Sequence, residues 1–301
     1  MAGAKKKATA PARRLRLGLP KGSLQATTEK LFTLAGFALR IPDRSYYPEI
    51  DDPDIECVLI RAQEMARYVQ QGVLDAGITG IDWVHENRAR VKEVSDLRAP
   101  WPNYSPVRWV VAVKEGSPIR RPADLAGKRI ATEVVNLTKR YLRGHGVSAK
   151  IEFSWGATEV KPPLLADAIV DVTETGSSLR ANNLRVLDTV LESTPRFIAN
   201  RASHADPRLR AVIDRVVLLL RGAILAADRV GLMMNVPRAK LSAVVDVLPA
   251  LGKPTVSTLT DDRWVAVNTV IEERLVKELL PRLREAGARG IVEYPLSKII
   301  E

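Results

Sequence analysis

The chain has 301 residues, of which 46% are hydrophobic and 27% charged, with 18 glycines and 19 prolines. These values predict a globular protein of about two domains and exclude collagen-like, low-complexity and disordered classes. The net charge is +11, but five of the cations fall within the first 14 residues, so the remainder is only mildly basic. A few cations in one cleft suit a small phosphorylated substrate as well as a polynucleotide.

The first 14 residues predict a solvated, disordered basic tail, because they carry lysines and arginines but no acid. No apolar signal segment precedes Leu15, and Arg221 interrupts the longest apolar stretch, 216–227. The single cysteine, Cys57, excludes an internal disulfide and fits a reducing compartment. We therefore expect a cytoplasmic protein without a membrane span.

The next part of the chain, to residue 227, alternates short apolar runs with segments whose apolar residues recur at helical spacing. This order predicts an α/β fold with mostly parallel sheets, covered by helices and binding ligands at the carboxyl ends of strands. The predicted strands are 14–19, 57–61, 74–79, 108–114, 128–132, 149–154, 168–172, 186–192 and 196–200. The predicted helices are 24–35, 64–71, 137–143, 177–183 and 207–227, with another beginning at Ile81.

The last part of the chain, 229–301, has a different order of elements, βαββαβ. It predicts a separate ferredoxin-like domain, whose sheet commonly pairs with another copy or binds a small effector. The predicted elements are strand 230–236, helix 238–251, strands 254–259 and 264–271, helix 275–286 and strand 290–294.

Segment 166–179, ADAIVDVTETGSSL, predicts a strand ending in acids, then a hydroxyl-rich turn and a helix. Free backbone N–H groups at 176–178, the helix dipole and the hydroxyls would form a phosphate cradle. Asp167 and Asp171 share one face of the strand at about 13 Å. A carboxylate beside a phosphate is repulsive unless it accepts hydrogen bonds from ribose hydroxyls or holds Mg²⁺. The segment therefore predicts a ribose 5-phosphate site, although a TGSS turn taken alone more often only caps a helix.

Two cations occur where predicted strands end. Lys21 lies in the first βα turn beside Gly22, where the backbone can approach an anion, and Arg61 ends a strand. Both are candidates for contacting an anion, against the ordinary alternatives of a solvated turn residue and a surface charge. Thr79 and Gly80, which open the next helix, form a weaker anion site. The chain has neither GxxxxGK[ST] nor GxGxxG, so ATP would not be held by a Walker loop.

Together these pieces resemble the ATP phosphoribosyltransferases, the first enzymes of histidine biosynthesis, in their long form. The similarity spans residues 15–300. The matching motifs are LPKGSL at 19–24, DAGITG at 75–80, KRIAT at 128–132, KRYL at 139–142, and Glu159 followed by 167–179. Two departures stand out: the segment VKPPLLA between Glu159 and Asp167 is one residue shorter and lacks the family's glycine, and TGSSL replaces the usual TGxTL.

The resemblance implies a two-lobed, periplasmic-binding-protein-like (type II) α/β core around a cleft, followed by an ACT-like domain. It places lobe I at 15–105 with 190–227, lobe II at 106–189, and the ACT-like regulatory domain at 229–301.

The implied reaction joins N1 of the ATP adenine to C1 of phosphoribosyl pyrophosphate and releases pyrophosphate, with Mg²⁺ as cofactor and L-histidine as feedback inhibitor. The candidate catalytic residues are Lys21, Arg61 and Asp171, and Asp171 is also the candidate Mg²⁺ ligand. The candidates for binding phosphoribosyl pyrophosphate are Glu159, Asp167, Asp171, Thr173, Glu174, Thr175, Gly176, Ser177 and Ser178. The candidates for binding ATP or pyrophosphate are Lys21, Gly22, Thr79 and Gly80. The candidates for binding histidine are Asn235, Thr255, Ser257 and Ala266.

The alternative function is a cytoplasmic two-lobed sensor of small molecules, which needs the cleft but no catalysis. A nucleic-acid-binding protein is a third reading that rests on net charge alone, and we expect no nucleic-acid or membrane partner. The histidines His85, His145 and His204 are too widely spaced to predict a metal site. The resemblance also implies a homo-oligomer, dimeric or hexameric.

Overall fold

The structure is a computed structural model that describes residues 13–42, 44–101, 103–249 and 253–301. The chain divides into two compact units, of which the larger ends at Val217. The smaller comprises Leu34–Gly36 and Leu218–Glu301. In the described part of the chain, no helix is long and apolar enough to cross a membrane.

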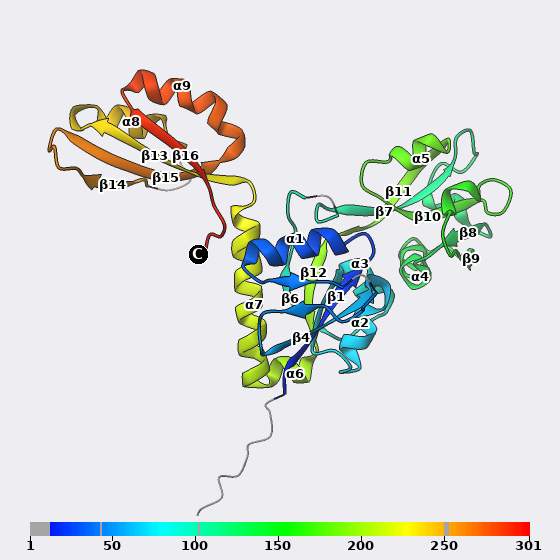
Figure 1. The fold of residues 1–301 in the computed structure, drawn as a ribbon. Coiled ribbons are helices and arrows are strands. Elements are labelled where there is room, and N and C mark those ends of the chain that lie inside the picture. The colour runs from blue at the N-terminus through cyan, green and yellow to red at the C-terminus, as the bar shows by residue number, and fades with distance from the viewer. Residues whose placement is uncertain (1–12, 43, 102, 250–252) are drawn as a thin grey trace, which may run out of the picture. The chain divides into compact units, whose positions relative to one another are not determined.

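The larger unit contains two five-stranded sheets, drawn in Figure 1 with their helices. The first sheet has the order β4-β1-β5-β12-β6, in which β1 is parallel to β4 and β5, and β12 is antiparallel to β5 and β6. Its strands are β1 (Leu15–Lys21), β4 (Ile55–Arg61), β5 (Ala76–Gly80), β6 (Lys92–Asp96) and β12 (Pro195–Ala199). A small hairpin-like pair adds β2 (Leu39–Arg40) and β3 (Glu49–Ile50). The helices in these stretches of the chain are α1 (Gln25–Ala35), α2 (Ala62–Gln70), α3 (Ile81–Glu86), α6 (Arg201–Ala205) and α7 (Pro207–Ala226).

The second sheet has the order β11-β7-β10-β8-β9. Strands β10, β8 and β9 are parallel, whereas β7 is antiparallel to β10 and β11. Its strands are β7 (Val107–Lys114), β8 (Arg129–Thr132), β9 (Lys150–Phe153), β10 (Ala168–Thr173) and β11 (Leu184–Ser193). Its helices are α4 (Val135–Gly144) and α5 (Ser177–Ala181).

The expectation of mostly parallel sheets was wrong, because both sheets are mixed. The chain passes from the first sheet to the second between β6 and β7, and returns between β11 and β12. Among the described residues of the two passages, 97–101 with 103–106 and residue 194, there is no helix, and the leaving and returning strands pair antiparallel in each sheet. Antiparallel neighbours need no helical crossover, which explains why the α/β alternation fails at these two places.

The core of the first sheet is dense around two glycines. Alternate leucines of β1 are fully buried, and a side chain added at Gly18 or Gly77 would overlap the sulfur of Met65 on α2. The backbones of β1 and β5 therefore lie directly against α2, which fixes that helix over the sheet.

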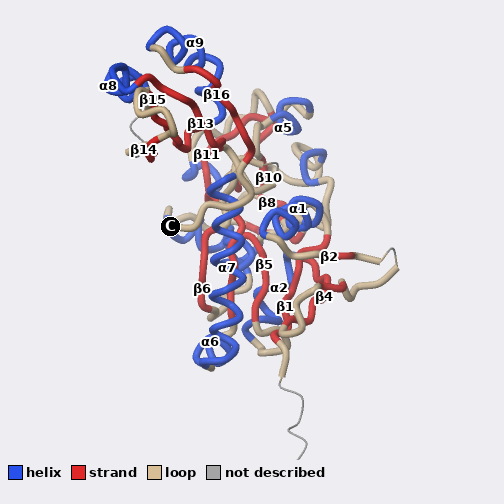
Figure 2. Tube along the Cα trace, turned by 60° about the vertical axis from the view of Figure 1, so that its left-hand side comes forward, coloured by secondary structure: helices blue, strands red, loops and turns tan. Residues whose placement is uncertain are grey.

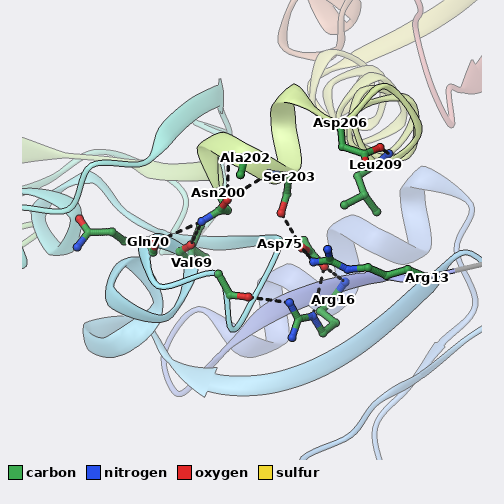
Figure 3. Close-up of polar contacts among 11 residues, drawn as sticks. Arg13, Arg16, Val69, Gln70, Asp75, Asn200, Ala202, Ser203, Asp206 and Leu209 are labelled. Carbon is green, nitrogen blue, oxygen red and sulfur yellow. Dashed lines mark hydrogen bonds and ion pairs between the residues drawn. The ribbon is translucent and has the colours of Figure 1, made fainter.

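A buried carboxylate secures the amino-terminal end of β5, as Figure 3 shows. Asp75 is fully buried and accepts hydrogen bonds from the Arg16 backbone N–H at 2.9 Å and the Ser203 hydroxyl at 2.6 Å. Arg13 forms an ion pair with it, and Arg14 forms one with Glu56. Arg13 and Arg14, which the sequence assigned to the basic tail, thus belong to the fold, while residues 1–12 lie outside the described part.

The smaller unit has the order βαββαβ expected from the sequence. Its four-stranded sheet is ordered β14-β15-β13-β16, and Figure 2 shows α8 and α9 together on one side of it. Its strands are β13 (Arg229–Pro237), β14 (Thr255–Thr258), β15 (Trp264–Glu272) and β16 (Arg289–Pro295), and its helices are α8 (Leu241–Val247) and α9 (Val276–Ala286). The predicted end of the first helix, at residue 251, was wrong. Leu248 is extended, with ψ at 137°, because the following Pro249 disfavours a helical backbone.

The predicted fold class is confirmed. The α/β core with its two sheets and the ferredoxin-like C-terminal unit are both present.

Candidate active site

A pocket of about 480 Å³ lies in the larger unit and is lined from both sheets. Lys21, Arg61 and Gly80 are the last residues of β1, β4 and β5. Glu133 and Glu174 directly follow β8 and β10. The pocket is therefore at the carboxyl ends of parallel strands, where α/β sheets bind ligands. Its other lining residues are Gly22, Ser23, Leu24, Ala62, Gln63, Asp82, Trp83, Asn103, Ser105, Val107, Trp109, Val172, Thr173, Ser193, Thr194 and Pro195.

Two cations lie side by side at one end of this pocket. Lys21 and Arg61 are register partners at the ends of β1 and β4. Among the described residues, no carboxylate forms an ion pair with either of them. The Lys21 ammonium lies 3.9 Å from the centre of the exposed Tyr46 ring and lowers the pKa of that tyrosine through a hydrogen bond. Two unpaired cations in one pocket form a site for a polyanion.

Gly22 follows Lys21 with a positive φ of 109°, and nothing would lie within 4 Å of a Cβ there. This conformation favours glycine, and the open space leaves the backbone accessible to a ligand.

The backbone N–H groups at the amino-terminal end of α3, beside the pocket, already donate to acceptors within the protein. The backbone N–H of Ile81 donates to the Thr194 carbonyl at 3.1 Å, and that of Asp82 donates to the Ser193 hydroxyl at 3.3 Å. Thr79 is fully buried and donates its hydroxyl to the Ala62 carbonyl at 2.7 Å. Of the pair predicted as a weaker anion site, only Gly80 lines the pocket.

The hydroxyl-rich turn after β10 reaches the pocket at its beginning, through Thr173 and Glu174. The sequence predicted free backbone N–H groups at residues 176–178, but two of the three have partners within the turn. The N–H of Gly176 donates to Thr173 Oγ1 at 2.8 Å, and that of Ser177 donates to Thr175 Oγ1 at 3.4 Å. The threonine hydroxyls satisfy these donors locally, as such turns commonly do. Gly176 has a φ of 75°, which suits glycine.

Glu159 lies against this turn despite the shortened segment that follows it. Its Oε1 accepts a hydrogen bond from the Ser178 hydroxyl at 2.7 Å. On the pocket side of the same turn, Glu174 accepts one from the Ser105 hydroxyl at 2.5 Å. The turn is thus tied to the chain on both sides by carboxylate–hydroxyl contacts.

The two aspartates of β10 have different surroundings. Burial raises the pKa of Asp171 to about 6, with smaller contributions from the charges of Glu159 and Glu133. Asp167 precedes the strand, and its carboxylate accepts the backbone N–H of Arg129 at 2.8 Å. The structure therefore brings Asp171 near the pocket but leaves Asp167 at the other end of β10, in a structural contact.

The acids do not form a complete metal site by themselves. Within the described ranges, no group of three or more His, Cys, Asp or Glu residues could hold a metal ion. Mg²⁺ commonly takes only one or two carboxylates and completes its shell with substrate phosphates and water. A desolvated carboxylate such as Asp171, close to other acids, fits that mode of binding.

Sequence reasoning missed the buried pair Asp82 and Trp109, which joins the two sheets at the pocket wall. The Trp109 indole N–H, on β7, donates to Asp82 Oδ2, at the start of α3, at 2.7 Å. Burial raises the pKa of Asp82, although this hydrogen bond opposes the shift. The two residues are 27 apart in sequence and lie on α3 and on β7 of the second sheet, so no local pattern could pair them.

Sequence reasoning also missed Glu133, although its place directly after a predicted strand could have marked it. Its pKa is raised mainly by burial, and Gln63 of α2 donates a hydrogen bond to its Oε1 at 3.5 Å.

The four candidates for histidine binding come together on one face of the smaller unit's sheet. Asn235 of β13 is the register partner of Ala266 of β15, and Ser257 of β14 is the partner of Ala266 on its other side. Thr255 lies two residues before Ser257 on β14, and its register partner is Asn268. The buried neighbours along these strands point to the opposite face, which packs against α8 and α9.

Comparison with protein families gives two matches that cover most of the chain. The model described as "ATP phosphoribosyltransferase" (HisG) matches residues 61–222. The model described as "HisG, C-terminal domain" matches residues 226–298.

Individual relatives are similar along nearly their whole length. An "ATP phosphoribosyltransferase" of Solibacter usitatus is 59% identical over 286 residues, covering 95% of this chain and 99% of the relative. One of Chlorobaculum parvum is 56% identical over 287 residues, covering 95% and 98%. Among solved structures, the "ATP phosphoribosyl transferase (HisG:HisZ) complex from Thermotoga maritima" matches with a TM-score of 0.58 and 29% identity, over 68% of this chain and 98% of that one.

Proposed function

The chain belongs to the ATP phosphoribosyltransferase family, in its long form with a C-terminal domain, and from this premise we propose how its residues carry out the reaction. The reaction joins N1 of the ATP adenine to C1 of phosphoribosyl pyrophosphate, releases pyrophosphate and opens histidine biosynthesis. One observation carries the assignment to this pocket: Lys21 and Arg61, which have no ion-pair partner among the described residues, share it with Thr173 and Glu174.

Lys21 and Arg61 act on the leaving group. As the bond between C1 and the pyrophosphate oxygen breaks, the electron pair leaves with pyrophosphate and C1 becomes cation-like. Two fixed cations stabilise the charge that develops on pyrophosphate, and they need no reorganisation at that moment. The open backbone at Gly22 lets a phosphate approach closely.

The turn after β10 holds the ribose 5-phosphate. Asp171 accepts hydrogen bonds from the ribose hydroxyls, and residues 173–178 bind the phosphate. A phosphate oxygen is a stronger acceptor than the hydroxyls that now hold the N–H groups of Gly176 and Ser177, so it can replace them. Glu159 positions Ser178 for this contact. Asp167 and Thr79 support the site through their backbone contacts, without touching substrate.

Mg²⁺ is the proposed cofactor, with Asp171 as its protein ligand. A Mg²⁺ ion held there would supply Lewis-acid stabilisation of the negative charge on the departing pyrophosphate. Burial and the charges of Glu159 and Glu133 raise the pKa of Asp171, and a bound cation would offset both effects, which is consistent with this role.

We further propose that histidine binds the sheet face carrying Asn235, Thr255, Ser257 and Ala266, and that the protein is a cytoplasmic homo-oligomer. The predicted domain limits, 15–105 with 190–227, 106–189 and 229–301, remain part of this proposal.

Pyrophosphate release by the purified protein with Mg²⁺ tests the activity. We expect release only when ATP and phosphoribosyl pyrophosphate are both present, and we expect L-histidine to suppress it. Binding of both compounds without release would instead identify a ligand sensor built on this fold. Release that histidine does not affect would contradict only the regulatory part.

A further inference from the structure

Glu133 occupies a distinctive place in the pocket, at the contact between the two sheets. It follows β8 of the second sheet, while its hydrogen-bond donor Gln63 belongs to α2, which directly follows β4 of the first. The side chain is half-buried, and the contact engages only Oε1. Within the described part of the chain, no donor reaches Oε2. One carboxylate oxygen thus has a long contact with Gln63, while the other is available to a ligand.

The charged neighbours of Glu133 place it near both proposed substrate sites. Glu133 lines the same pocket as Arg61 and Asp82. Its charge also raises the pKa of Asp171. Arg61 lies at the proposed pyrophosphate site, and Asp171 precedes the residues Val172 and Thr173 that line the pocket at the proposed ribose site. The reacting atoms, C1 and the adenine N1, have to meet between these two sites.

The chemistry at the edge of adenine matches this carboxylate. Beside N1, adenine carries a 6-amino group, which donates hydrogen bonds, whereas a 6-oxopurine carries an accepting oxygen and a proton on N1. We propose that Glu133 recognises the adenine of ATP, with its free oxygen accepting a hydrogen bond from the 6-amino group and so holding N1 toward C1. This inference rests on the proposed function and adds the determinant of base specificity.

The same carboxylate also contributes to the reaction itself. When the N1–C1 bond forms and the C1–oxygen bond to pyrophosphate breaks, the adenine ring is left with a positive charge. A carboxylate beside the ring stabilises this charge more in the transition state than in the ground state, so Glu133 affects kcat as well as KM.

The test compares Glu133→Gln with wild type, because glutamine keeps the length of the side chain and can still contact Gln63. We expect kcat/KM for ATP to fall at least tenfold, with the KM for phosphoribosyl pyrophosphate changing less than twofold. Calorimetric titration with ATP and with ITP measures recognition without turnover. The glutamine amide can donate to the 6-oxygen of ITP and accept from its N1–H, so the preference for ATP should fall at least tenfold.

Two further variants separate recognition from structure. Glu152→Gln removes the same charge from an exposed position on β9 and should leave both the kinetics and the ATP/ITP ratio unchanged. Glu133→Asp keeps the charge and should retain more of the ATP preference than the glutamine variant. Thermal melting of each variant checks that it is folded.

Two results would overturn the proposal. The first is an unchanged ATP/ITP affinity ratio in a folded Glu133→Gln variant. The second is an equal loss of ATP preference in Gln63→Ala, because the contact between the two side chains would then matter and not the charge of Glu133. Failure of the proposed function would be visible elsewhere, as wild-type protein that releases no pyrophosphate while still discriminating between the nucleotides.

Discussion

At the scale of single residues, the proposed chemical role of Asp171 carries a cost in stability. Its pKa in the folded protein is about 6, above the ordinary 3.8, so the folded state binds more protons than the unfolded state between these values. The free energy of unfolding should therefore fall as pH rises from about 4 to 6 and stay lowered above it. We expect Asp171→Asn to melt at a higher temperature than wild type at pH 8 without ligand, yet to lose at least a hundredfold in kcat/KM. A variant that is both less stable and fully active would contradict this assignment.

Lys21 allows a cleaner separation of binding from folding, because it is exposed and has no carboxylate partner among the described residues. Lys21→Ala should lower kcat/KM by roughly ten- to a hundredfold, since one of the two cations on the leaving group is lost. Its melting temperature should stay within a degree or two of wild type. Lys92→Ala, an exposed cation on β6, serves as the matched control and should retain full activity.

At the scale of elements, the hydrogen bond between Trp109 and Asp82 couples β7 of the second sheet to α3 beside the first. Trp109→Phe leaves a buried carboxylate without this donor and should cost about 1–3 kcal/mol in unfolding free energy, with an added packing loss. Adding Asp82→Asn to Trp109→Phe removes the carboxylate charge that lost its donor. The unfolding free energy of the double variant should therefore fall by less than the sum of the decreases in the two single variants. Denaturant titration of the four proteins gives the coupling, and additive losses would show that the contact does not join the elements.

The same scale shows what the sequence could predict. Strands β1 and β4 are recognisable from their apolar runs, and their last residues, Lys21 and Arg61, were therefore found as site candidates. Strand β6 was missed because KEVSD is polar and none of its residues is buried. Residues such as Asp82, Trp109 and Ser105 were missed for a different reason: their meeting in the pocket depends on how the two sheets come together, which no local spacing records.

At the scale of the whole molecule, the candidate active site and the proposed histidine-binding face belong to different units. Every residue that lines the described pocket precedes Val217, whereas Asn235, Ala266 and Ser257 form their row in the smaller unit. Ala266→Trp should fill the centre of that row and raise the histidine concentration for half-inhibition at least tenfold. The uninhibited kcat should change less than twofold, because no part of the pocket is altered. Inhibition curves at saturating substrate measure both, and wild-type inhibition would exclude this face as the effector site.

The two passages of the chain between the sheets also set an order of assembly during translation. The second sheet uses only strands between residues 107 and 193, so all its strands are available once that continuous stretch has left the ribosome. The first sheet, begun earlier, lacks its fourth strand until β12 emerges and inserts between β5 and β6. Its pairing of β12 with β6 spans about a hundred residues, and such distant pairing forms slowly. Of the two sheets of the larger unit, the one begun first is therefore completed second. Until β12 inserts, the edges of β5 and β6 are exposed to chaperones and to misassembly.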